Sequence, residues 1–183
     1  MDKGLKTFLC GRSPLVEEEQ NWQAGASALL QTRATYTLLP SDSPPLRLVT
    51  SVRALLTRGG RIMVVRDPEG EHIIPGGRVD AGEGLLEALE RELLEETGWS
   101  VRGDPVLIGL FHYHIHSPEP SGYRYPYPDF LQLVYRAEAG GHFPDAVEAS
   151  GYELGAGFRA LNDVQRLVLS QGEMALLQLL QEF

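Results

Sequence analysis

The sequence is poor in cysteine, in basic residues and in long apolar runs. Its single cysteine, Cys10, excludes an internal disulfide framework and is typical of a reducing compartment. No apolar run approaches the roughly 20 residues that a membrane-spanning helix needs. The first residues, MDKGLKTFLCGR, contain neither the apolar segment nor the cleavage pattern of a secretory signal. We therefore expect a cytoplasmic protein without a membrane partner.

Negative charge exceeds positive charge, with 25 acidic residues against 16 Lys and Arg and a formal net charge of -9. This balance excludes binding of long nucleic acid through a basic surface, because such a surface needs an excess of cations. It does not exclude a nucleotide, since a metal ion and a few arginines reverse the potential inside one cleft. With 183 residues, 43% of them hydrophobic, the chain suits one domain with a real core.

The first 48 residues contain no clear functional pattern. Three glutamates near the start of residues 16–30 and several alanines within that range predict a short helix there. Residues 33–39 alternate like a strand, and residues 40–45 are typical of a turn or linker. The segment 1–48 is either a small lobe over the core or an extension that contacts a second copy in a homodimer. The sequence leaves both alternatives open.

From residue 49 the pattern becomes regular. Gly59-Gly60 and Pro68-Glu69-Gly70 are turn signals that separate apolar runs, which predicts short strands on either side of them. The expected strands are residues 49–58, 61–67, 71–75, 105–116 and 130–137, and one near Phe158. The expected helices are residues 84–97, ending at Gly98, then 161–169 and 173–180, the last packing through Met174, Leu177 and Leu180.

The stretch from Gly76 to Trp99, GGRVDAGEGLLEALERELLEETGW, is a glycine-rich turn followed by an acidic helix. Glu92, Glu95 and Glu96 stand at helical spacing and share one face, beside an arc formed by Leu86, Leu89 and Leu93. Carboxylate oxygens of this kind suit Mg²⁺ or Mn²⁺, which also bind phosphates. The alternative is a solvated acidic helix face, the commoner origin of such a charge run.

The spacing of this stretch decides between the two interpretations. Gly77, five residues, Glu83, seven residues and then Arg91-Glu92-Leu93-Leu94-Glu95-Glu96-Thr97-Gly98-Trp99 resembles the complete signature of the Nudix hydrolase family. Only Trp99 departs from it, at a position where the family usually has an aliphatic residue. The resemblance implies an α+β fold, a Nudix-type α/β/α sandwich with a mixed β-sheet, in a domain of residues 49–183.

The resemblance also implies roles for the residues of the signature. Glu92, Glu95, Glu96 and the carbonyl of Gly76 are expected to bind Mg²⁺ (or Mn²⁺), while Arg91 and Glu83 orient the acidic cluster. Nudix enzymes often take one more acid from the region after the last long strand, where Glu148 and Glu153 are the candidates. Which glutamate serves as the general base remains open.

The expected reaction is hydrolysis of a diphosphate linkage in a nucleoside diphosphate derivative or a related pyrophosphate. Substrate contacts are expected from Arg78, Tyr113, Arg124, Tyr125 and Tyr127. The loop around Tyr123, Tyr125 and Tyr127 is either a platform on which a base stacks or a stiff loop that covers the core edge or a dimer interface. Several arginines can meet phosphate, although for any single one of them we favour a solvated strand-edge charge: Arg53, Arg61, Arg66, Arg78 and Arg124.

Three histidines, His112, His114 and His116, alternate along one expected strand and therefore share one face. Such a stripe is either a metal site or a half-exposed sheet face. We favour the sheet face, because the acidic cluster already accounts for a cation.

Two other functions are compatible with the fold. The first is a Nudix-fold isomerase of isopentenyl diphosphate, which needs a catalytic cysteine in the sheet region, whereas Cys10 lies near the start of the chain. The second is a non-catalytic Nudix-fold nucleotide-binding or regulatory module. That class tends to lose signature carboxylates, and this sequence retains them all. Hydrolysis is therefore the preferred prediction.

Overall fold

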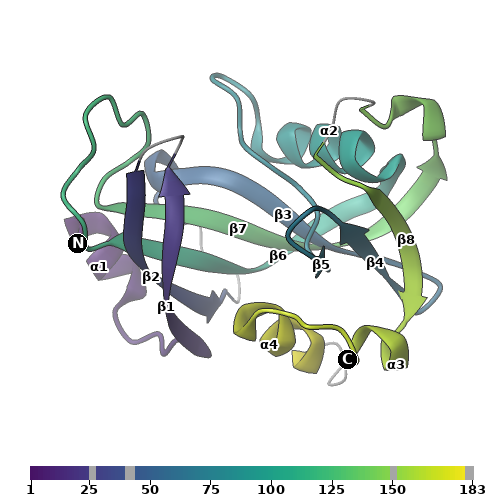
Figure 1. Cartoon of the computed structure of the whole chain (residues 1–183), viewed down its shortest axis with the longest axis horizontal. Helices are drawn as coiled ribbons and strands as arrows, with labels where there is room; N and C mark the ends of the chain where they lie inside the picture. Colours follow the sequence, from purple (N-terminus) through teal and green to yellow (C-terminus); the bar gives the residue numbers. More distant parts are fainter. Residues whose placement is uncertain (25–27, 40–43, 149–151, 180–183) are drawn as a thin grey trace.

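The structure, a computed structural model, describes residues 1–24, 28–39, 44–148 and 152–179 (Figure 1). None of the helices within these ranges is long and apolar enough to cross a membrane. The elements follow one another as α1 (Lys3–Leu9), β1 (Val16–Ala24), β2 (Ala28–Leu38), η1 (Leu46–Leu48), β3 (Val49–Arg58), β4 (Arg61–Arg66), β5 (Glu71–His72), α2 (Leu85–Thr97), β6 (Trp99–Ile115), β7 (Asp129–His142), η2 (Pro144–Ala146), β8 (Gly155–Ala160), α3 (Leu161–Val164) and α4 (Gln171–Leu179).

The described strands form one mixed sheet in the order β1-β2-β6-β7-β3-β4-β5, and β8 pairs with β4. The β3–β7 pair is parallel, and the other pairs are antiparallel. Strands β6 and β7 are the longest and join the end that carries α1, β1 and β2 to the end that carries α2 and β4 (Figure 1). The expected α+β fold with a mixed sheet is confirmed.

Helices cover both faces of the sheet, as strand β3 demonstrates. Successive strand residues point to opposite faces, and here Ala54 and Leu56 pack in a cluster with Leu89 of α2. Leu55 between them packs on the other face with Val164 of α3 and Leu177 of α4. Burying each such leucine stabilises the fold by about 1.5–3 kcal/mol. The central strand is thus apolar on both faces because it lies inside an α/β/α sandwich.

The helix of the signature occurs where the sequence predicts it. It begins after Gly84 and ends at Thr97, because Gly98 adopts a left-handed conformation with φ 72° and donates its N–H to Leu94 O at 2.9 Å. Leu89 is fully buried, as expected for the packed arc. Leu86 was placed on the same arc and is 44% exposed, so that part of the prediction is wrong; Ala88 is buried instead.

The predicted helix within residues 16–30 is also wrong, since Val16–Ala24 forms strand β1, paired with β2. Alternation along β1 points Glu17 and Glu19 to one side, where Arg33 of β2 lies 3.6 Å and 2.8 Å from them. Pairing between strands, which a single segment does not reveal, outweighs the local helical signal. The strand expected at residues 33–39 is confirmed as part of β2, which pairs with β6. Residues 25–27 and 40–43 lie outside the described ranges.

Several element lengths differ from expectation. Strand β5 is only Glu71–His72 rather than residues 71–75, and β7 extends from Asp129 to His142 rather than over residues 130–137. Strand β6 begins at Trp99 rather than residue 105, because register shifts in its pairing with β7 accommodate the glycine and proline that resemble a loop. The helix expected at residues 161–169 is only Leu161–Val164 long. In α4, Leu177 is buried as predicted, but Met174 is 52% exposed, and Leu180 lies outside the described ranges.

Candidate active site

The signature loop lies against β3 almost as an additional strand. Ala54 donates its backbone N–H to Pro75 O at 2.9 Å, Val52 to Gly77 O at 2.9 Å, and Val79 to Thr50 O at 3.1 Å. These bonds satisfy the backbone groups of a loop that would otherwise leave them unpaired. The loop is therefore fixed to the centre of the sheet.

Two glycines in this loop have no room for a side chain. Gly76 has φ 131°, and a Cβ there would lie 2.4 Å from the Val52 carbonyl oxygen. At Gly77 a Cβ would lie 2.2 Å from the Glu92 carboxylate. The glycine pair therefore permits the close approach of the loop to β3 on one side and to the acidic helix on the other.

Arg91 holds three glutamates around one guanidinium group. Its Nε lies 2.8 Å from Glu83 Oε1, and its Nη1 lies 2.9 Å from Glu92 Oε1 and 3.1 Å from Glu95 Oε2. Its Nη2 donates to the carbonyl of Arg78 at 3.0 Å. The hydrogen bonds from Arg91 lower the pKa of Glu83 to about 2. Glu83 is thus fixed as an anion that orients Arg91, which in turn positions Glu92 and Glu95.

Glu96 completes the acidic cluster from the next helical position. Its Oε2 accepts the N–H of Gly76 at 2.8 Å. The pKa of Glu96 is raised to about 7, chiefly by burial; the charge of Arg53 and the hydrogen bond from Gly76 oppose this rise, and the neighbouring charges of Glu153 and Glu92 add to it. Burial also raises the pKa of Glu92. Carboxylates that lie this close together repel one another, and a bound cation relieves this repulsion. Their hard oxygens fit Mg²⁺ or Mn²⁺.

A cavity of about 370 Å³ lies beside the signature loop. The Arg78 guanidinium lies 4.8 Å from the centre of the Tyr125 ring, and Tyr113 stacks on Phe130 with ring centres 4.8 Å apart. Arg53 lines the cavity and also acts electrostatically on Glu92 and Glu96. The lining residues are Gln20, Thr50, Ser51, Arg53, Arg78, Tyr113, Tyr123, Tyr125, Phe130 and Gln132.

The structure brings some of the predicted substrate residues together and separates others. Arg78, Tyr113 and Tyr125 line the cavity. Arg124 is exposed and is not among the lining residues, and the Tyr127 hydroxyl donates instead to Ser117 O at 2.8 Å. Sequence reasoning missed five lining residues, Gln20, Thr50, Ser51, Phe130 and Gln132. The pairing of Tyr113 with Phe130 in the β6–β7 hairpin would have indicated Phe130.

The two candidates for an additional acid differ in position. Glu153 is half-buried, and its charge raises the pKa of Glu96, which places it within electrostatic reach of the cluster. Glu148 is exposed, and its backbone N–H donates to Glu95 O at 3.0 Å, at the C-terminal end of α2. Glu153 is therefore the better placed of the two with respect to Glu96.

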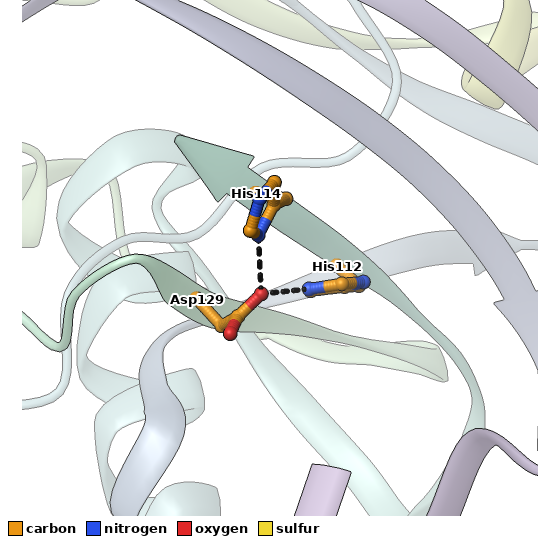
Figure 2. Close-up of side chains that lie close together, drawn as sticks. All are labelled: His112, His114 and Asp129. Atoms are coloured by element: carbon orange, nitrogen blue, oxygen red, sulfur yellow. Dashed lines mark hydrogen bonds and ion pairs between the residues drawn. The ribbon is translucent and has the colours of Figure 1, made fainter. Parts of the chain in front are cut away.

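The histidines form a separate cluster. His112 Nε2 lies 2.9 Å and His114 Nδ1 lies 2.7 Å from the same atom, Asp129 Oδ1 (Figure 2). His116 is exposed and lies 3.5 Å from Glu19. Sequence reasoning did not predict Asp129. The register of the β6–β7 hairpin, which pairs His114 with Asp129, would have indicated this residue.

The sequence matches the model of the NUDIX domain over residues 47–178. The chain therefore belongs to the Nudix family. Its structure resembles a mutant form of the pyrophosphohydrolase BsRppH from Bacillus subtilis, with a TM-score of 0.54 and 20% identity over 69% of this chain and 72% of that one. It also resembles a MutT NUDIX hydrolase from Burkholderia pseudomallei, with a TM-score of 0.51 and 24% identity over 71% and 96%. These likenesses show the fold. Comparison with the curated proteins gave no match.

Proposed function

We propose that this protein is a Mg²⁺-dependent (or Mn²⁺-dependent) pyrophosphohydrolase that cleaves the diphosphate linkage of a nucleoside diphosphate derivative by attack of water on phosphorus. One observation carries the proposal: the acidic cluster and the aromatic, cationic cavity adjoin one another. Arg53 lines the cavity and acts on Glu96, while Arg78 lines the cavity and accepts a hydrogen bond from Arg91 through its carbonyl. Phosphates held by these arginines therefore lie next to the glutamates.

Glu92, Glu95, Glu96 and the carbonyl of Gly76 would hold the metal ions. A bound divalent cation offsets the charge of the phosphates and acidifies a water molecule. The protein's own contribution is to keep the carboxylates in position, which Arg91 does for Glu92 and Glu95 and the Gly76 N–H does for Glu96. Carboxylates that are held in position in this way need little reorganisation when charge develops at phosphorus.

The cavity suits the group attached to the phosphates. Its volume of about 370 Å³ is within the range of about 300–1,000 Å³ that is usual for small-molecule sites. The rings of Tyr113, Tyr123 and Tyr125 offer flat surfaces on which a base can stack. The amides of Gln20 and Gln132 offer donors and acceptors for its polar edge. A nucleoside accordingly fits this lining better than a plain alkyl diphosphate does.

The test is phosphate release in the presence of Mg²⁺ over a panel of nucleoside diphosphate derivatives and dinucleoside polyphosphates. We expect the unaltered protein to be active, and Glu95→Gln to lower turnover by at least about 10²-fold. The matched control is Glu90→Gln, an exposed glutamate on the opposite side of the same helix, which should keep full activity. Tight nucleotide binding without turnover of any member of the panel would contradict hydrolysis and indicate a binding module.

A further inference from the structure

The cluster of His112, His114 and Asp129 has the composition of a transition-metal site. The three candidate ligand atoms, one from each residue, all lie within 4.8 Å of one another. Ligands of a tetrahedral Zn²⁺ ion at about 2.0–2.1 Å are roughly 3.3 Å apart. To admit an ion, the two histidine contacts of 2.9 Å and 2.7 Å to Asp129 Oδ1 need to open by less than an ångström. The two histidine nitrogens, which lie within 4.8 Å of one another, need to approach by up to about 1.5 Å.

The surroundings of the cluster fix the carboxylate and leave one side open. Asp129 Oδ2 accepts the backbone N–H of Asp2 at 2.9 Å, which leaves Oδ1 as the atom that both imidazoles approach (Figure 2). Asp129 is 1% exposed and His112 is 4% exposed, whereas the His114 side chain is 27% exposed. An outer partner that orients a ligand and a path for entry are both features of metal sites. The path here lies on the side of His114.

This cluster is separate from the acidic cluster of the signature helix. His112 and His114 alternate along β6 with Tyr113, which lines the substrate cavity. Alternation points the histidines to the opposite face of the sheet, where the Asp2 N–H at the start of α1 reaches Asp129. The ligand chemistry also differs. Two imidazoles and one carboxylate suit Zn²⁺ and similar first-row ions, whereas the oxygens of the glutamates suit Mg²⁺.

We propose that His112, His114 and Asp129 form a second metal site, which takes a divalent transition ion of the Zn²⁺ class. The ion joins β6 to β7 through its ligands and joins the start of α1 to the sheet through the Asp2 contact to Asp129. Three protein ligands leave the fourth position of a tetrahedral ion to water, on the sheet face behind the substrate cavity. The proposal does not depend on hydrolytic activity.

The experiment compares Zn²⁺ held by the full chain and by two single variants after dialysis against a weak chelator. His114→Gln keeps an amide N–H to donate to Asp129 but is a poor zinc ligand. His116→Gln is the matched control, because His116 lies on the same stripe and outside the cluster. We expect His114→Gln to hold one equivalent less than the unaltered chain, and the affinity of this site to fall by more than about 10–100-fold. His116→Gln should hold as much as the unaltered chain.

Equal Zn²⁺ in the unaltered chain and His114→Gln would overturn the proposal, since the contacts would then be ordinary hydrogen bonds. A second measurement uses the unaltered chain, so it tests the proposal even if His114→Gln does not fold. With Co²⁺ bound to the unaltered chain, the imidazole proton signals of His112 and His114 should show large paramagnetic shifts. Unshifted signals at one equivalent of Co²⁺ and above would equally overturn it.

Discussion

The two clusters of candidate metal ligands in this chain are built in different ways. The acidic cluster comes from one continuous stretch, in which Arg91 holds Glu92 and Glu95 and the Gly76 N–H of the glycine turn holds Glu96. The histidine cluster is assembled from two strands, and its carboxylate, Asp129, is 15 residues from His114 in the chain. A site within one helix is encoded by spacing alone, whereas a site between strands depends on their register.

The clusters also differ in how their charge is balanced. The glutamates crowd together, and burial raises the pKa values of Glu92 and Glu96, so this cluster favours a cation strongly. In the other cluster one carboxylate already receives contacts from two imidazoles and the Asp2 N–H. Loss of a ligand should therefore impair activity at the first cluster and only metal content at the second.

The largest effect should come from removing the charge of Glu96. We expect Glu96→Gln to lower kcat by about 10²–10⁴-fold, because the amide is neither a good metal ligand nor a proton acceptor. The fold should survive, because Glu96, with a pKa of about 7, is already partly protonated near neutral pH. Steady-state kinetics with Mg²⁺ and a melting curve without metal measure the two effects. Full Mg²⁺-dependent turnover by this variant would remove Glu96 from the site.

A smaller effect should follow from filling the space at Gly77. A Cβ there would lie 2.2 Å from the Glu92 carboxylate, so Gly77→Ala should displace Glu92 and weaken Mg²⁺ binding by about 10–100-fold. Gly157→Ala is the matched control, because nothing lies within 4 Å of a Cβ at that position. Calorimetric titration with Mg²⁺ compares the two. Equal affinity in both variants would show that the position of Glu92 does not matter for the ion.

Without metal, the stability of the fold should depend on pH through Glu96. Its pKa is raised from 4.5 to about 7 in the folded protein, so the folded state binds more protons than the unfolded state between these values. The stability that Glu96 itself contributes is then fully present below about pH 4.5 and is lost as the pH rises through about 7, a change of about 1–3 kcal/mol. Urea denaturation in chelating buffer at several pH values measures the slope. Glu96→Gln should lack this part of the slope, and an unchanged slope would contradict the assignment.

The smallest effect should appear at the cavity. The Tyr125 ring faces the Arg78 guanidinium, and loss of its stacking surface costs about 0.5–1.5 kcal/mol. We expect Tyr125→Ala to raise KM by roughly 2–12-fold with little change in kcat, because the ring contacts the substrate away from the reacting atoms. Tyr127→Ala, in the same loop but outside the cavity, is the control. If kcat instead falls by a larger factor than 1/KM, Tyr125 acts near the reacting phosphates.

Local patterns in the sequence predicted the parts that depend on neighbouring residues. The helix at residues 85–97 was predicted almost to its ends, because Gly98 and the leucine spacing act within a few residues of one another. The β3–β4 hairpin was predicted for the same reason, through Gly59-Gly60. The contact between Arg91 and Glu83 was also predicted, because both residues lie within the signature.

Parts that depend on distant pairing were not predicted. Within their own segment, Glu17 and Glu19 are typical of the start of a helix. Only the pairing of β1 with β2 brings Arg33 close to them. Gln20 and Gln132 reach the cavity from β1 and β7, which are separated in sequence by most of the chain. Asp129 was missed because only the register of β6 and β7 brings it to the histidines. Local spacing carries no information about such pairs.

The backbone bonds between the signature loop and β3 make the loop as rigid as the sheet. Val52 and Ala54 both donate to the loop, and β3 is at the same time paired in parallel with β7. Opening the loop therefore requires breaking hydrogen bonds to a strand that is buried at its centre. In hydrogen exchange, the amides of Val52 and Ala54 should be exposed only by global unfolding, unlike those of an ordinary surface loop. Under the proposed function, substrate exchange would therefore depend on motion of other segments, while this loop stays fixed to the sheet.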